Sequence, residues 1–100
     1  MEPGETQKES LPELFTAGEW KALAKELGLT PRQQEVARLI CRARSKEAIA
    51  QELSVSVPTV RMHADALYKR LGVHSRLGLA IRFVLVQRKL TGPTRVRGET

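Results

Sequence analysis

This sequence is poor in aromatic residues, in cysteine and in long apolar stretches. Aromatic residues make up 4% of its 100 residues, which is too few for a platform on which bases could stack. Cys41 is the single cysteine, so no intrachain disulfide can form, and a reduced, cytoplasmic compartment is expected. The most apolar stretch, 77–86, contains Arg82 and is too short to span a bilayer. We therefore expect a cytoplasmic protein without a membrane partner.

Enzymes and metal sites need residue patterns that this chain lacks. It has no Ser/His/acid arrangement, no glycine-rich phosphate loop and no paired carboxylates typical of a catalytic cleft. His63 and His74 are its two histidines, and no acid or thiol stands at ligand spacing on the helical face of His63. We therefore expect no enzymatic activity, no bound metal and no cofactor.

Charge is plentiful but unevenly placed along the chain, whose formal net charge is +6. Residues 1–28 hold six Glu against three Lys, whereas residues 29–100 hold fourteen Arg or Lys against five acidic residues. A basic body with an acidic leader fits a polyanionic partner, because each phosphate that is neutralised releases counterions. A well-solvated surface would have the same composition, so charge alone does not decide between the two.

Helical periodicity recurs through the middle of the chain, and no segment alternates like a strand. Thr16 and Glu19 form a capping box flanked by the hydrophobic staple of Phe15 and Trp20, and Gly28 closes this first helix. Four further caps are predicted, at Thr30, Ser45, Ser56 and Ser75. The fold class is therefore all-α. We expect a disordered leader at 1–10, an extra N-terminal helix at 11–28, the main domain at 29–90 and a disordered tail at 91–100.

Residues 45–72 contain two short helical patterns on either side of a tight, serine-flanked break. Helices joined by so short a turn cross steeply, which is the helix-turn-helix arrangement that brings a helix to the DNA major groove. At ~100° per residue, the inner side of the second helix, about 57–71, is predicted to consist of Val60, Ala64, Leu67 and Leu71. Its outer side, which would meet base edges, carries Pro58, Arg61, Met62, Asp65 and Lys69. A flank where phosphates are expected carries Thr59, His63 and Arg70.

The last predicted helix, about 76–90, has more apolar surface than one helix of so small a domain needs to bury. Its main stripe, which Leu79, Phe83 and Val86 widen, consists of Leu77, Ala80, Ile81, Val84 and Leu85. We predict that this stripe contacts another chain and forms a dimer interface.

About half of the chain carries an ordered set of residues over a four-helix frame. The set runs through Leu29-Thr30-Pro31-Arg32, Glu35-Val36, Ser45, Ile49-Ala50, Leu53, Val55-Ser56, Thr59-Val60-Arg61, His63, Leu71-Gly72-Val73 and Ser75-Arg76. In this spacing the chain resembles the LuxR/GerE-type helix-turn-helix domain of bacterial transcription regulators. The resemblance implies a four-helix, winged-less domain whose third helix is the recognition helix and whose fourth supports dimerisation. The helix before Leu29 lies outside it.

The resemblance also implies roles for single residues. Arg61 and Met62 take base-facing positions, Thr59 and His63 backbone-positioning ones, and Arg70 the position of a phosphate-contacting residue. A family lysine that tends to touch DNA is replaced by Glu47, for which Lys46 can compensate from next door. The candidate DNA-binding residues are therefore Lys46, Ser56, Thr59, Arg61, Met62, His63, Asp65, Lys69 and Arg70.

Two departures from the family pattern affect the backbone and the groove face. Ala43 stands where the family has a glycine, so that helix end must either be strained or terminate differently. Asp65 repels phosphate but can accept a hydrogen bond from cytosine N4.

For three of these residues, a simpler structural role is an alternative to contact with DNA. Arg61 is either a solvated arginine or a bidentate partner of guanine. Its position on a helix that directly follows a tight turn favours the contact with DNA. His63 fits a link between helices as well as it fits a phosphate donor. Met62 either touches thymine methyl groups or is tolerated at the surface.

The leading hypothesis is a sequence-specific, duplex-DNA-binding bacterial transcription regulator that works as a homodimer. Two-fold symmetry then predicts an inverted-repeat operator with half-sites about one helical turn apart. With only residues 1–28 ahead of the domain, no receiver or ligand-binding domain is expected there. One alternative is a module similar to sigma-factor region four, with RNA polymerase as its partner. The other is an interaction module that sequesters a related regulator by heterodimerisation through its last helix; Glu47, Asp65 and the acidic leader favour it.

Overall fold

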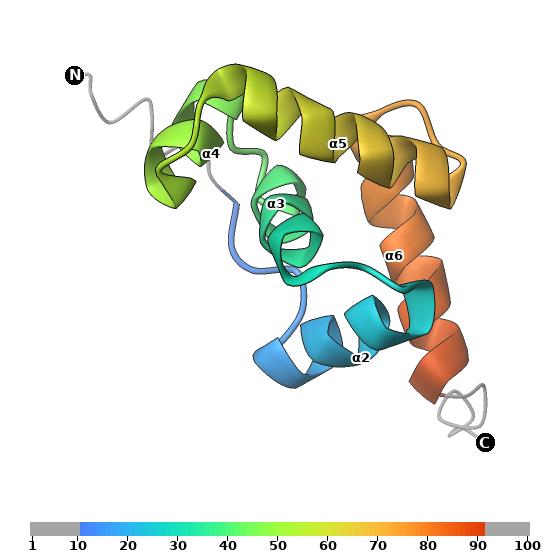
Figure 1. Ribbon diagram of the computed structural model, residues 1–100. Helices are drawn as coiled ribbons and strands as arrows, with labels where there is room; N and C mark the ends of the chain where they lie inside the picture. Colours follow the sequence, from blue (N-terminus) through green and yellow to red (C-terminus); the bar gives the residue numbers. More distant parts are fainter. Residues whose placement is uncertain (1–10, 92–100) are drawn as a thin grey trace.

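Five helices follow one another in residues 11–91, the part of the chain that this computed structural model describes (Figure 1). They are α2 (Ala17–Leu27), α3 (Pro31–Cys41), α4 (Lys46–Leu53), α5 (Val57–Leu71) and α6 (Arg76–Thr91). Residues 11–91 contain no strand. The all-α class is confirmed, with a four-helix frame preceded by one extra helix. The predicted leader at 1–10 lies outside the described residues, as does the predicted tail beyond Thr91.

The predicted capping residues mark the starts of the helices. The hydroxyl of Thr16 accepts the backbone N–H of Glu19 at 3.1 Å, and the Glu19 carboxylate accepts the N–H of Thr16 at 2.8 Å. The rings of Phe15 and Trp20 meet edge to face with centroids 5.1 Å apart, which confirms the staple. The other caps form at Thr30, Ser45, Ser56 and Ser75, whose side chains each accept a backbone N–H three residues on.

The helix inside the predicted segment 11–28 begins only at Ala17. Residues 11–16 form a non-helical strap that is tied to the end of α3. The N–H of Leu11 donates to the carbonyl of Arg42 at 2.8 Å, and the Arg42 Nε donates back to the Leu11 carbonyl at 2.6 Å. The Glu13 carboxylate pairs with the guanidinium of Arg38. The strap thereby sets where α2 starts relative to α3.

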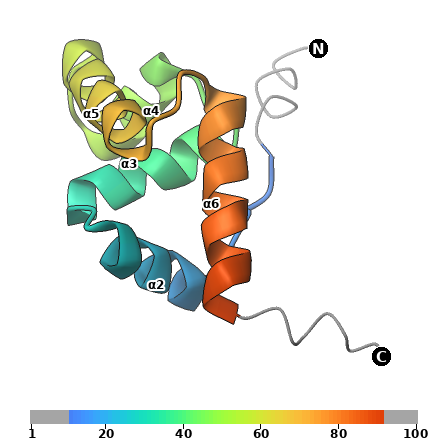
Figure 2. The same cartoon turned by 90° about the vertical axis from the view of Figure 1, so that its right-hand side faces the viewer.

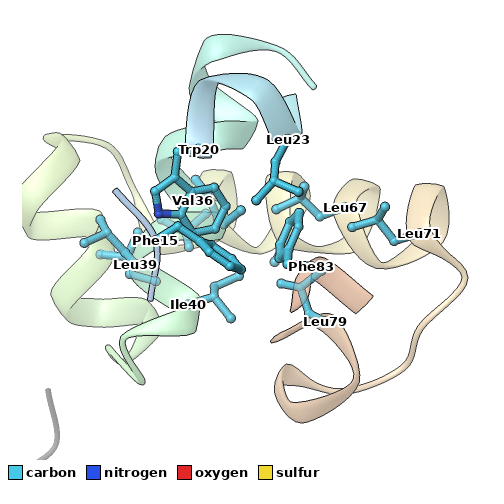
Figure 3. Packing of buried hydrophobic residues seen from close by; sticks show 14 of the residues in the cluster. Phe15, Trp20, Leu23, Val36, Leu39, Ile40, Leu67, Leu71, Leu79 and Phe83 are labelled. Carbon is cyan, nitrogen blue, oxygen red and sulfur yellow. The ribbon is translucent and has the colours of Figure 1, made fainter. Parts of the chain in front are cut away.

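All five helices share one hydrophobic core, part of which Figure 3 shows. Trp20 lies between two rings, because it also meets Phe83 edge to face at a centroid distance of 5.1 Å. The predicted inner side of α5 is buried, as are aliphatic side chains from each neighbouring helix: Leu23, Leu39, Ile49, Val60, Ala64, Leu67, Leu71 and Leu79. The extra helix is thus a full part of the core.

The rotation of α6 divides its apolar side chains between the core and the surface. Leu79 and Phe83, predicted to widen the apolar stripe, are fully buried. Leu77, Ile81 and Leu85, predicted to contact another chain, are 69%, 49% and 52% exposed. The physical reason is the contact between Trp20 and Phe83, which turns the aromatic side of α6 inward against α2. Figure 2 shows α2 beside the C-terminal half of α6.

Among the described residues, two other than glycine adopt the left-handed backbone conformation. Ala43, just after α3, has φ 61°, and Ser54, at the end of α4, has φ 58°. Ala43, which stands where the family pattern has a glycine, therefore has a strained backbone. Within residues 11–91, none of the helices combines the length and the apolar character needed to cross a bilayer.

Candidate nucleic-acid interface

The turn between α4 and α5 is short and defined at both ends. The N–H of Ser54 donates to the carbonyl of Gln51 at 3.3 Å, and the N–H of Val55 donates to that of Ala50 at 2.9 Å. Ser56 then caps α5, its hydroxyl accepting the N–H of Thr59 at 3.2 Å. Three residues therefore suffice to redirect the chain from one helix into the next. In Figure 1, α5 runs along the upper edge of the molecule with α4 at its N-terminal end.

The outward side of α5 is polar and accessible along its length. Met62 is 60% exposed. Arg61, Asp65 and Lys69 are exposed as well. The ion pairs found within residues 11–91 involve other side chains. The predicted base-facing side of α5 is thus accessible along its length.

The flank of α5 has a different character. The hydroxyls of Ser56 and Thr59 lie 2.9 Å apart and hydrogen-bond to each other, so both belong to the cap of α5. His63 is half-buried, a position that fits both a helix-to-helix link and a donor to phosphate. At the start of α4, Lys46 is half-buried and Glu47 is exposed in the first turn, where a carboxylate stabilises the helix dipole.

Arg70 has a partner that the sequence did not predict. Its Nη1 donates to the carbonyl of Leu27, the last residue of α2, at 3.3 Å. The two residues are 43 positions apart, so no local pattern announces this contact. Arg70 is nevertheless exposed and keeps further N–H donors for another acceptor.

A hollow of about 420 Å³ lies next to Arg70. It is lined by Gln33 of α3 and by Ala66, Lys69 and Arg70 of α5. Gln33 is not among the DNA-binding residues predicted from the sequence, and its side chain takes part in the capping box with Thr30. The fold therefore adds a neutral amide to the basic end of α5.

Among the described residues, perturbed pKa values are found at Cys41 and at Tyr68. Burial, together with a smaller effect of the nearby Glu13 carboxylate, raises the pKa of Cys41 to about 12. Burial is also the main reason why the pKa of Tyr68 is raised. Within the described part of the chain, no group of three or more His, Cys, Asp or Glu side chains is placed to hold a metal ion.

The predicted dimer residues divide into two groups. Leu77, Ile81 and Leu85 follow one another at intervals of four residues and are well exposed, so they line one side of α6. Ala80 and Val84 are half-buried at its border, where Val84 packs against the core. We name the three exposed residues the α6 stripe.

Two helices joined by a short turn, the second with a buried inner side and an accessible outer side, define a helix-turn-helix DNA-binding domain. Comparison with protein families agrees, since residues 27–83 match the family described as bacterial regulatory proteins, luxR family. The match covers more than half of the chain, so this protein belongs to the LuxR family of DNA-binding transcription regulators. This is a family of DNA-binding domains rather than of enzymes.

Two relatives show how far the similarity extends. The chain is 32% identical to YhjB of Escherichia coli (strain K12) over 73 residues, which cover 68% of this chain and 36% of YhjB. It is 35% identical to transcriptional regulatory protein MctR of Rhizobium johnstonii over 77 residues, 71% of this chain and 36% of MctR. The chain thus spans little more than a third of either relative. No solved structure matches it. Nearly all of α2 precedes the family match, which begins at residue 27.

Proposed function

We propose that this chain binds duplex DNA sequence-specifically as a homodimer, with α5 in the major groove, and so regulates transcription in the bacterial cytoplasm. One observation carries the proposal: α5 buries Val60, Ala64 and Leu67 while its opposite side leaves Arg61 and Met62 accessible. A helix presented in this way by a tight turn fits the width of the major groove.

Each exposed group on α5 has a chemical counterpart in the groove. The fork of Arg61 matches the O6 and N7 acceptors of guanine, and the Met62 thioether is suited to the methyl group of thymine. Asp65 can accept from cytosine N4, and Lys69 adds a positive charge near the backbone. Around this centre, Thr59, His63 and Arg70 from the flank and Ser56 and Lys46 from the turn and α4 are candidates to position the phosphates.

The α6 stripe supports the homodimer. Its three side chains form an exposed apolar row on one helix, and an isologous contact would cover the row of each copy with that of the other. Two copies of α5 would then face two half-sites related by two-fold symmetry. We expect an inverted repeat with half-sites about one helical turn apart.

The test is Arg61→Ala, measured on the duplex that the protein itself selects from a random pool. Loss of one bidentate contact should lower affinity for that duplex by roughly ten- to a hundredfold and relax the preference at one position of the half-site. Lys21→Ala is the control, because Lys21 is an exposed cationic side chain on α2, outside both α5 and α6. Unchanged binding by Arg61→Ala would show that the recognition assignment is wrong. A flat salt titration of the unmodified protein would contradict phosphate contact altogether.

One observation favours a second candidate function, in which α6 pairs with a different regulator. The sequence of α6 contains no acidic residue, while Arg82, Arg88 and Lys89 are all exposed. Pairing of two identical α6 helices brings like charges together, whereas a partner helix with acidic residues would complement them. Sequestration of such a partner predicts a monomer in sedimentation and no shift of any duplex.

A further inference from the structure

We propose that the hollow between α3 and α5 takes one phosphate of the DNA backbone, and that α2 orients Arg70 for it. The inference rests on the proposed function, since it assigns a further contact within the same DNA complex. It also gives a role to the end of α2, a helix of which all but Leu27 precedes the family match.

The chemistry of the hollow is that of an anion site. Two cationic side chains, Lys69 and Arg70, and one neutral amide, Gln33, surround the small side chain of Ala66 in a space of about 420 Å³. Among residues 11–91, no acidic side chain lines it. An ammonium, a guanidinium and an amide together supply several N–H donors, which suits a phosphate with its accessible oxygens.

Gln33 enters this site with its amide already oriented. Its Oε1 accepts the backbone N–H of Thr30 at 3.0 Å, and the Thr30 hydroxyl accepts the N–H of Gln33 at 3.0 Å. The capping box therefore occupies the oxygen of the amide and leaves the NH₂ group as a donor. Gln33 is half-buried, so little side-chain entropy remains to be lost when it binds.

Arg70 is held from the other side by the end of α2. Its Nη1 donates to the Leu27 carbonyl, one of the last carbonyls of α2, where the helix dipole places partial negative charge. Gly28 closes α2 in the left-handed conformation at φ 68°, and a Cβ there would lie 3.4 Å from the Arg70 Nη1. The end of α2 thus fits closely against the guanidinium. One hydrogen bond to a carbonyl leaves the other donors of Arg70 for phosphate.

The hollow continues the row of predicted phosphate contacts on α5. Thr59, His63, Ala66 and Arg70 follow one another at intervals of three or four residues, so they share one flank of the helix. A DNA strand that passes Thr59 and His63 would reach the hollow next. Lys69, predicted at the sequence level to face base edges, lines this hollow and is assigned to phosphate instead.

The first experiment replaces the three polar side chains one at a time: Gln33→Ala, Lys69→Ala and Arg70→Ala. Affinity should fall equally for the selected duplex and for an unrelated one, because a phosphate contact carries no sequence information. We expect a loss of roughly two- to tenfold for Gln33→Ala and tenfold or more for Arg70→Ala. Lys69→Ala and Arg70→Ala should each lower the salt slope by about 1, whereas the neutral Gln33→Ala should not.

Lys21→Ala is the matched control, since Lys21 is an exposed lysine in the middle of α2 that does not line the hollow. Equal effects of Lys21→Ala and Lys69→Ala would overturn the site, because total charge would then explain the result. Wild-type affinity in Gln33→Ala and an unchanged salt slope in Lys69→Ala would overturn it as well.

The second experiment tests α2 with a pair of glycine variants. Gly28→Ala places a methyl group against Arg70, whereas the Cβ of Gly72→Ala meets no atom within 4 Å. Both glycines have nearly the same left-handed backbone, with φ 68° and 65°, so both variants carry the same strain. We expect Gly28→Ala to weaken DNA binding and lower the salt slope toward that of Arg70→Ala, while Gly72→Ala binds as the wild type does. Equal binding by the two variants would overturn the role of α2.

The outcomes separate this inference from the proposed function. A wild-type protein that binds no duplex overturns both. A wild-type protein whose preference for its selected duplex depends on Arg61, but whose binding is insensitive to Gln33, Lys69 and Gly28, overturns the phosphate site alone. If Arg70→Ala loses binding while Gly28→Ala binds as the wild type does, Arg70 contacts phosphate but α2 does not orient it.

Discussion

At the scale of single residues, the backbone of Ala43 is strained and the pKa of Cys41 is raised. Ala43 closes the end of α3, its N–H donating to the carbonyl of Ile40 at 2.9 Å, but it does so at φ 61°. An L-residue with a Cβ is strained in this conformation by about 1–2 kcal/mol. Cys41, two residues earlier, is half-buried and packs against the core.

Ala43→Gly should therefore stabilise the protein. Relief of the strain outweighs the extra backbone entropy of glycine in the unfolded chain, so we expect the free energy of unfolding in urea to rise by up to about 1 kcal/mol. Ala22→Gly is the control: Ala22 is exposed inside α2, where glycine should lower stability by about 1 kcal/mol. A lower stability of Ala43→Gly would contradict the left-handed geometry at this position.

Cys41 should be inert in the native protein. With its pKa raised to about 12, the thiol stays protonated at pH 8, and the thiolate is the reactive form. Labelling by a disulfide reagent at pH 8 should be slow and should become fast in urea. The same shift predicts lower stability as pH rises from the ordinary pKa of 9.0 toward 12, because only the unfolded state releases the proton there. In Cys41→Ala this part of the alkaline destabilisation should be absent, and rapid native labelling would refute the burial.

At the scale of elements, α2 joins the rest of the molecule mainly through Trp20. Its ring contacts Phe15 ahead of the helix and Phe83 of α6, both edge to face. A hydrogen bond of 3.3 Å from the Gln87 Nε2 to the Glu19 carboxylate adds to the same junction. The indole N–H of Trp20 is buried without a hydrogen-bond partner among the described residues, so the ring acts through its apolar surface.

Trp20→Ala should accordingly remove the main packing contact between α2 and the rest of the protein. Removing a fully buried tryptophan should lower the free energy of unfolding by about 3–5 kcal/mol. Trp20→Phe keeps a ring between Phe15 and Phe83 and removes the unpartnered N–H, so its loss should be clearly smaller. Urea denaturation followed by circular dichroism measures both. Equal stability of the two variants would mean that α2 is not held by this ring.

At the scale of the whole molecule, the two candidate surfaces lie on different helices. Figure 1 shows α5 along the upper edge and α6 descending on the right. In the proposed homodimer, the α6 stripes of two copies would pair while each α5 contacts one half-site.

Ile81→Glu should separate dimerisation from DNA contact. A carboxylate in the middle of the α6 stripe should disfavour the dimer, which sedimentation measures, and should weaken binding to an inverted repeat much more than to a single half-site. Leu14→Glu is the matched control, since Leu14 is an exposed leucine of the strap outside α6. A dimer that persists in Ile81→Glu would place the interface elsewhere.

The sequence by itself determined the class of the fold, the starts of the helices and the face of α5 that turns outward. These features depend on local physics: a hydroxyl three residues before a free N–H caps a helix, and a 3.6-residue period separates Val60 and Leu67 from Met62. The family pattern also predicted that the helix end at Ala43 is either strained or terminates differently, because the missing glycine can be seen in the sequence alone.

Only the tertiary structure decided how α6 is rotated and what surrounds Arg70. The stripe on α6 is apolar on several sides, so its periodicity did not show that Phe83 faces inward until the ring of Trp20 was in place. The contact from Arg70 to Leu27 and the nearness of Gln33 to Lys69 join residues distant in sequence. Such contacts depend on how whole helices pack together, so the local sequence pattern does not predict them.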